Sequence, residues 1–166
     1  GRGTTNEAIA SFRMAVDAYT TLVDFDGRNV LWRYELGAAL GNLAAEYQRS
    51  GDLDGASEAA TSATALLDLV SASDPENMQL ARGAADARVA RGFTEVLKGD
   101  APAAIASYKL AEPVLSQLVQ RHPDSMDFLS SLAGVRARLG DAYMVVGDDA
   151  NAVRSHAGAV EAHSMA

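Results

Sequence analysis

Three histidines are the residues of this chain best suited to bind a metal ion or to transfer protons near neutral pH, because the chain has no cysteine. His156 and His163 are seven residues apart, a spacing that places both on one face of a helix. No carboxylate completes a set of three metal ligands around them, and His122 stands apart from both. We therefore expect surface or capping roles for the histidines, and neither a metal site nor a cofactor.

The serines and acidic residues show no pattern typical of catalysis. No serine lies in a nucleophile elbow, and none is paired with a histidine and an aspartate. The acidic pairs Asp24/Asp26 and Asp148/Asp149 lie where we expect turns, and the capping of helices explains them. We predict that the chain is not an enzyme.

Five arginines follow two neighbouring segments that we expect to be helical, and two interpretations of them are open. The first is a set of solvated salt bridges, for example between Arg91 and Glu95, four residues apart. The second is a basic patch that binds an acidic peptide. The five residues are Arg82, Arg88, Arg91, Arg136 and Arg138.

The elements that must position these side chains are helices. Apolar residues make up 48% of the chain, and most of them are Ala or Leu, which lose little side-chain freedom in a helix. The 22 acidic residues against 14 basic ones give a net charge of −8, which disfavours nucleic acids and anionic membranes as partners. No apolar run approaches the roughly 20 residues that span a bilayer. We expect an all-α protein in the cytoplasm, without membrane insertion.

The sequence repeats itself at an interval of 48 residues. Asn29 and Asn77 share one column with Ser125, and other columns keep the same register over three periods. Glycines, alanines and large apolar residues all recur in phase, so the chain contains genuine internal repeats. The clearest columns are Gly3, Gly51, Gly99 and Gly147; Ala8, Ala56, Ala104 and Ala152; and Trp32, Leu80 and Phe128.

Each period predicts two helices, in the middle repeat from about residue 77 to 98 and from about 101 to 121. Applied throughout, this register gives seven helices in one domain, residues 1–166, made of a half repeat (3–26) and repeats 27–74, 75–122 and 123–166. Pro75 and Pro123 fit the first turn of a helix, where a missing N–H costs nothing. Pro113 lies inside an expected helix and predicts a kink or break just before it.

The ends of these helices also follow the repeat. We expect left-handed glycines to end the first helix of each pair and aspartates to cap the start of the second. The glycines are Gly51, Gly99 and Gly147, and the aspartates are Asp52, Asp100 and either Asp148 or Asp149.

These columns resemble the tetratricopeptide repeat (TPR), in which a Leu-Gly pair, a Tyr, a turn Gly and spaced alanines recur. The last repeat matches the pattern best, with Leu139, Gly140, Tyr143, Gly147 and Ala152. The resemblance implies an α-solenoid of antiparallel helix pairs wound into a right-handed superhelix. It also implies a protein-protein interaction scaffold that binds a peptide or partner segment on the concave face.

The repeat is longer than the usual TPR of about 34 residues. Extended repeats with an opening such as Asp74-Pro75-Glu76-Asn77 resemble those attached to bacterial serine/threonine kinases and nucleotide cyclases. This resemblance implies a regulatory or sensory domain of a larger bacterial signalling protein as the alternative function.

The family register also predicts which residues face a partner. Phe93, Val96, Leu97 and Met144 would form an apolar patch on the first helices, either as a binding surface or as core within the longer helices. Self-association through this patch, giving a homodimer, is a further possibility beside binding of another protein. The full set of expected partner-binding residues is Asn42, Gln48, Arg49, Phe93, Val96, Leu97, Arg138, Asp141 and Met144.

Overall fold

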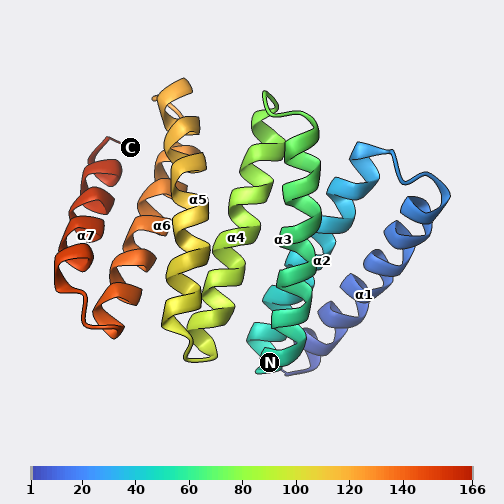
Figure 1. Ribbon diagram of the computed structural model, residues 1–166. Helices are drawn as coiled ribbons and strands as arrows, with labels where there is room; N and C mark the ends of the chain where they lie inside the picture. The colour runs from blue at the N-terminus through green and yellow to red at the C-terminus, as the bar shows by residue number, and fades with distance from the viewer. Residues whose placement is uncertain (1, 166) are drawn as a thin grey trace.

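Seven helices form the computed structural model, which describes residues 2–165 (Figure 1). No strand occurs within these residues, so the expected all-α solenoid is confirmed. Gly1 and Ala166, the ends of the expected domain, lie outside the described part of the chain. The helices are α1 (Arg2–Phe25), α2 (Val30–Ser50), α3 (Leu53–Ser73), α4 (Met78–Leu97), α5 (Ala101–Arg121), α6 (Met126–Val145) and α7 (Asp149–Ser164).

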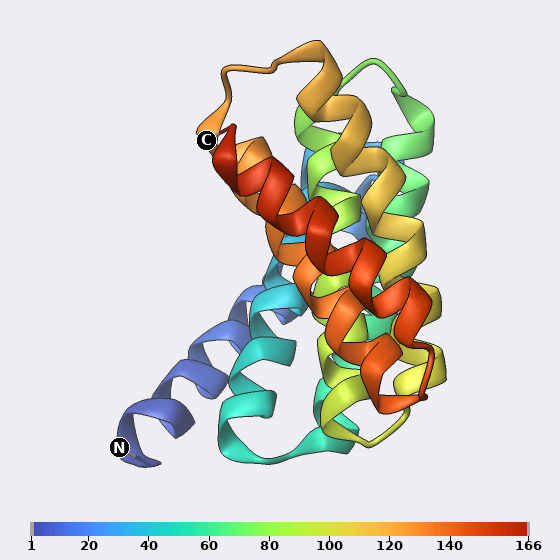
Figure 2. The same cartoon turned by 90° about the vertical axis from the view of Figure 1, so that its left-hand side faces the viewer.

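Helices that follow one another in the chain lie side by side and antiparallel, and α2, which lies partly behind α3 in Figure 1, also packs against α4, so the row is more than one helix deep. We call α2, α4 and α6 the first helices, and α1, α3, α5 and α7 the second helices. The first helices begin 48 residues apart, at Val30, Met78 and Met126. Figure 2 views the row from its α7 end, where the N-terminal end of α1 projects to one side. The division into a half repeat and three repeats within one domain stays a prediction.

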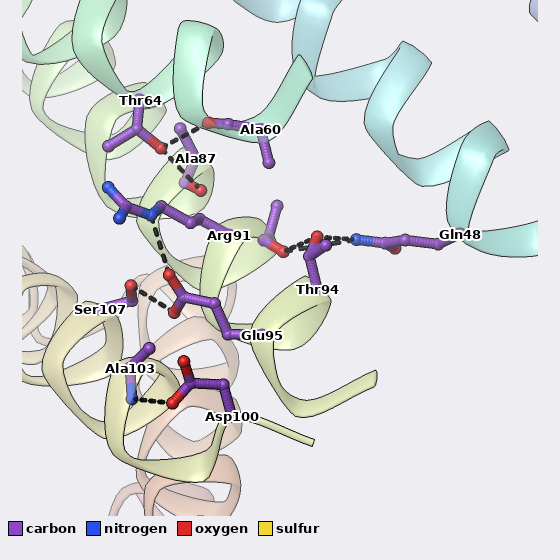
Figure 3. Close-up of polar contacts among 11 residues, drawn as sticks. Gln48, Ala60, Thr64, Ala87, Arg91, Thr94, Glu95, Asp100, Ala103 and Ser107 are labelled. Carbon is purple, nitrogen blue, oxygen red and sulfur yellow. Dashed lines mark hydrogen bonds and ion pairs between the residues drawn. The ribbon is translucent and has the colours of Figure 1, made fainter. Parts of the chain in front are cut away.

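The starts of the second helices are capped as expected. The Asp100 carboxylate accepts a hydrogen bond from the Ala103 N–H at 3.0 Å (Figure 3). Asp52 and Asp148 accept the corresponding bonds from Gly55 and Asn151. Each bond satisfies one of the N–H groups that a helix start leaves free. Of the two aspartates considered for α7, Asp148 is therefore the cap.

The prediction that Pro75 and Pro123 lie in the first helical turn is wrong. Both lie in the turns that precede α4 and α6, which begin at Met78 and Met126. The reason is that Asn77 and Ser125 cap these helices, and a cap fixes the helix start at the next residue. Proline suits the turn because its φ is already restricted.

The sequence predicts a kink or a break at Pro113, and the break is wrong, since α5 runs without interruption from Ala101 to Arg121; the kink stays a prediction. Proline deprives the Lys109 carbonyl of its N–H partner, but Lys109 is exposed to water, which can satisfy that carbonyl. Beside it, Arg88 Nη1 donates to the Leu110 carbonyl at 3.0 Å. Burial of neighbouring residues of α5 on both sides of the proline, such as Ala111 and Leu115, stabilises the continuous helix.

Left-handed glycines end the three first helices, as predicted. Gly51, Gly99 and Gly147 have φ values of 85°, 80° and 76°. At Gly99 the next N–H, that of Asp100, returns to the Glu95 carbonyl at 2.9 Å, a closure typical of helix ends. Gly3, which shares their repeat column, lies inside α1.

Replacing Gly99 by alanine should lower the free energy of unfolding by about 1–2 kcal/mol, the cost of a left-handed backbone for a residue with a Cβ. No atom lies within 4 Å of the position that the Cβ would take, so the effect is conformational and not steric. The measurement is urea unfolding followed by circular dichroism. The control is Gly41→Ala within α2, also in open space, which should gain about 0.5–1 kcal/mol from helix propensity. An equal change in the free energy of unfolding at both sites would contradict the left-handed conformation of Gly99.

Within each pair, a small residue of the first helix faces a larger one of the second. A Cβ on Gly92 would lie 2.5 Å from the Tyr108 ring, and one on Gly140 would lie 2.7 Å from His156. A Cβ on Gly37 would similarly meet Leu67 at 2.6 Å. The helices of a pair therefore cross closely because glycine leaves room for the opposite side chain.

Candidate functional site

The first helices α2 and α4 are separated by a groove with a volume of about 370 Å³. Leu67 of α3 contributes to its lining, and the two flanking helices supply the rest. Most lining residues are glycine or alanine, so the walls are largely backbone and methyl groups. The lining residues are Tyr34, Gly37, Ala38, Gly41, Asn42 and Ala45 of α2, Leu67 of α3, and Gly83, Asp86, Ala87 and Ala90 of α4.

Contacts between α2 and α4 define the two ends of the groove. At one end the Tyr34 ring lies against Gly83, where an added Cβ would be 2.8 Å from it. At the other end, beyond Ala45 and Ala90, the Gln48 side chain crosses from α2 and donates to Thr94 Oγ1 at 2.8 Å (Figure 3). The same Gln48 amide lies 3.4 Å from the Ala90 carbonyl oxygen.

Between these contacts the helices carry too little side-chain volume to close the gap. Gly41 lies midway along α2, and a Cβ built on it would have no atom within 4 Å. Gly37, Gly41 and Ala45 follow one another at intervals of four residues, which places them on one face of the helix. The groove therefore follows from a small-residue face that is held open by the larger residues at its ends.

Two polar side chains, Asn42 and Asp86, accompany the apolar lining. Desolvation raises the pKa of the Asp86 carboxyl above its ordinary value, and the charge and hydrogen bond of Arg82 oppose this shift only in part. The Arg82 Nε atom lies 3.4 Å from Asp86 Oδ2. An apolar groove with a carboxylate beside it suits an apolar side chain accompanied by a hydrogen-bond donor or a cation.

The structure brings only some of the expected partner-binding residues to this groove. Asn42 lines it and Gln48 closes it, whereas Arg49 is exposed next to Gln48 and pairs with the buried Glu46. The others lie on α4 and α6, and all of them are exposed. These are Phe93, Val96, Leu97, Arg138, Asp141 and Met144.

The groove residues of α4 were missed by the sequence reasoning. Gly83, Ala87 and Ala90 follow one another at intervals of four and three residues, a spacing that places them on one helix face. The matching small-residue faces of α2 and α4 are the signal that could have found the groove. Val89, between Ala87 and Ala90 in the sequence, packs against the core and not into the groove.

Four of the five arginines form ion pairs, so the salt-bridge interpretation of these residues is confirmed. Arg91 pairs with Glu95 at 2.9 Å, as predicted, and Glu95 also accepts from the Ser107 hydroxyl (Figure 3). Arg82 pairs with Asp86 at 3.4 Å. Arg82 also pairs with Asp127 at 3.7 Å, and the other pairs are Arg88 with Asp68 and Arg136 with Glu112.

Arg88 and Arg136, which share a repeat column, join three helices each. Arg136 holds Glu112 of α5 and donates to the Gly158 carbonyl of α7 at 3.2 Å. Arg88 similarly holds Asp68 of α3 and the Leu110 carbonyl of α5. The two arginines tie neighbouring repeats together and are not free for an acidic peptide.

A second hollow, of about 630 Å³, lies between α5, α6 and α7. Its lining is about half polar and half apolar and carries charges of both signs, including Lys109, Arg154 and Glu161. Arg136 within it is already bound to Glu112 and Gly158. The pairing of Arg136 within the protein indicates a structural role for this hollow and not a binding site. We therefore place the candidate site in the groove between α2 and α4.

Across residues 2–165, His, Asp and Glu side chains nowhere gather in a group of three or more that could hold a metal ion. His156 lies 3.5 Å from Asp141 and against Gly140, and the pair has no third acidic or histidine partner in such a group. None of the helices in this part of the chain has the length and hydropathy that crossing a bilayer requires.

No protein-family model matches the chain, and no curated protein matches it. Among solved structures, it is similar to MamA MSR-1 C2, with 18% identity, a TM-score of 0.43 and coverage of 98% of this chain and 94% of that one. A crystal structure of MamA is 19% identical with a TM-score of 0.37, covering 93% and 90%. BtubC from P. vanneervenii is 14% identical with a TM-score of 0.29, covering 96% and 91%. Likenesses at these values identify neither a family nor a partner.

Proposed function

We propose that the chain is a protein-interaction scaffold, and that the groove between α2 and α4 takes a bulky apolar side chain from a bound peptide or partner segment. The observation that carries the proposal is the open space at Gly41, in the middle of a groove closed at both ends. A segment lying across the first helices would bury one anchor residue there. The absence of a catalytic constellation in the sequence also favours binding over chemistry.

The chemistry of the groove defines the anchor more closely. Ala38, Ala45, Ala87 and Ala90 offer methyl groups, so the favourable term is burial of apolar surface, about 25 cal/mol per Å². Asp86 places a half-exposed carboxylate beside the anchor, and we expect it to accept a lysine or arginine of the segment in addition to Arg82. We expect a segment with a Leu, Phe, Ile or Met followed or preceded by a basic residue.

The test begins with peptides selected from a random phage-displayed library on the purified chain. We expect Gly41→Phe to weaken the selected peptides at least about tenfold, equivalent to 1.4 kcal/mol, because the added ring occupies the groove. The dissociation constants are measured by fluorescence anisotropy.

The matched control for this experiment is Gly41→Ala, which adds one methyl group and should change the affinity less than about threefold. A circular dichroism melt tests whether both variants are folded, as we expect because a Cβ at position 41 would have no atom within 4 Å. Peptides that bind Gly41→Phe as tightly as the unmodified chain would contradict the proposed groove.

A second surface also has features of a binding site. Phe93, Val96 and Leu97 near the end of α4 are 39%, 40% and 42% exposed, and Met144 and Val145 near the end of α6 are more exposed still. Exposed apolar patches on this scale mark partner or self-association surfaces. This patch supports homodimer formation as the second candidate function.

Phe93→Ala should therefore lower the affinity for a partner or a second copy severalfold, while the helical content stays unchanged. Multi-angle light scattering over a range of concentrations separates the two cases. A mass near the 17.3 kDa of one chain at all concentrations would show that the chain does not self-associate, and would favour binding of a different protein at the patch. A doubled mass that Phe93→Ala returns to one chain assigns the patch to self-association. A large fall in the melting temperature would instead place Phe93 in the core.

The resemblance to extended repeats further leads us to propose a cytoplasmic regulatory or sensory role in a bacterial signalling protein. In this proposal the repeats carry the binding function, and an attached kinase or cyclase carries the chemistry. A parent gene that encodes such a catalytic domain supports this role, and a gene that encodes repeats alone contradicts it.

A further inference from the structure

The ion pair between Arg82 and Asp86, at the groove between α2 and α4, belongs to the middle repeat alone. The helix pairs of the other repeats form without it, so the repeat architecture does not require this pair of charges. It differs in this respect from the structural arginines, which recur in one repeat column. The residues in the same columns as Arg82 and Asp86 are Tyr34 and Ala38 in the first repeat, and Ser130 and Gly134 in the last.

Arg82 is shared between two carboxylates. Its Nε atom lies 3.4 Å from Asp86 Oδ2, and its Nη1 atom lies 3.7 Å from Asp127 Oδ2 in the first turn of α6. Its guanidinium carbon also lies 5.6 Å from the centre of the Phe128 ring. Both ionic contacts are longer than the usual distance of about 2.8 Å, whereas Arg91 of the same helix pairs at 2.9 Å. Arg82 is therefore not committed to the carboxylate beside the groove.

A second cation can reach Asp86. The Asp86 side chain is 52% exposed, and the contact with Arg82 involves only one of its two oxygens. A lysine or arginine arriving there would bring a like charge close to Arg82, which the two cations resist. Asp127, whose side chain is 81% exposed, and the Phe128 ring lie on the other side of Arg82 and can stabilise its charge there.

We propose that Arg82 determines how strongly the groove prefers a segment that carries a basic residue next to its apolar anchor. This inference rests on the function proposed for the groove. In the structure Arg82 partly neutralises Asp86 and so weakens the attraction for another cation. When the basic residue of the segment reaches Asp86, Arg82 shifts toward Asp127 and Phe128. Arg82 thus lowers the preference for a basic segment, and Asp127 raises it.

The probes are a fluorescein-labelled peptide selected on the purified chain and the same peptide with glutamine in place of its basic residue. The preference is the ratio of their dissociation constants, measured by fluorescence anisotropy, and we expect about threefold on the unmodified chain. Because both peptides meet the same protein, the ratio does not depend on the fraction of a variant that is folded. Selected peptides without a basic residue near the anchor, or a ratio of one, would overturn the proposal.

Three variants test the charges separately. Arg82→Gln should raise the ratio by about twofold, the size of effect expected for an exposed ion pair. Asp86→Asn should bring the ratio close to one, and Asp127→Asn should lower it because Arg82 then stays at Asp86. The control is Arg91→Gln, which removes the same charge from the same helix and should leave the ratio unchanged. No rise in Arg82→Gln, or an equal rise in Arg91→Gln, would overturn the proposal.

Gly41→Phe separates a failure of this inference from a failure of the groove itself. If Gly41→Phe weakens both peptides while Arg82→Gln leaves their ratio unchanged, the groove stands and the role of Arg82 is wrong. If Gly41→Phe weakens neither peptide, the groove is wrong, and the inference falls with it.

Discussion

Gly92→Leu is expected to lower the free energy of unfolding by about 3 kcal/mol, because overpacking a close helix crossing forces side chains and backbone apart. Even the Cβ of the new residue would lie 2.5 Å from the Tyr108 ring. Tyr108 is fully buried, so a larger residue at position 92 would have to displace its ring within the core. The measurement is equilibrium unfolding in urea, with the midpoint and slope determined separately.

The matched control for this prediction is Gly41→Leu, the same change within α2 at a site with no atom within 4 Å. It should be neutral or stabilising, since leucine is the better helix former. A double substitution, Gly92→Leu with Tyr108→Ala, should be less destabilised than the sum of the single changes, with a coupling of about 2 kcal/mol. Additive effects would show that Gly92 and Tyr108 do not determine the crossing.

Leu115→Ala is expected to cost about 2–5 kcal/mol, the range for removing a fully buried leucine side chain. Leu115 is 0% exposed and belongs to the core cluster that α4, α5, α6 and α7 share. The loss should therefore appear in the whole unfolding transition of this half of the molecule. Thermal and urea unfolding of the purified variant measure it.

Leu110→Ala is the control for the buried leucine, because Leu110 belongs to the same helix but is 59% exposed. Its carbonyl bond to Arg88 involves the backbone and survives the substitution. A change within about 0.5 kcal/mol is expected for such a surface site. Similar losses at Leu110 and Leu115 would contradict the packing of α5 described here.

The helices themselves could be predicted from the sequence because their ends are local. Aspartate caps and left-handed glycines act on the nearest turn of backbone, so residues such as Asp100 and Gly99 define boundaries without knowledge of the fold. Because the repeat is 48 residues long, each helix boundary in one repeat predicts the corresponding boundary in the others. Predictions at prolines failed where a neighbouring cap (Asn77) or the burial of neighbouring residues (Ala111 and Leu115 beside Pro113) outweighed the local preference.

The candidate site could be predicted only in part, because a groove depends on how far apart two helices stand. The family register found Asn42 and Gln48, which lie along the α2 side of the groove. It did not find Gly83 or Asp86, because their role depends on Tyr34 and Gln48 holding α4 away from α2. The distance between two helices is set by contacts between side chains that are distant in the sequence. A single sequence does not indicate which residues make these contacts.

The most direct test of the scaffold proposal is where a selected peptide lies on the chain. With alanine methyl groups labelled by ¹³C, intermolecular nuclear Overhauser effects report which methyls the peptide contacts. The proposal predicts effects from the peptide's apolar anchor to Ala38, Ala45, Ala87 and Ala90, the methyls of the groove. Effects confined to Ala157, which lines the hollow between α5, α6 and α7, would contradict it.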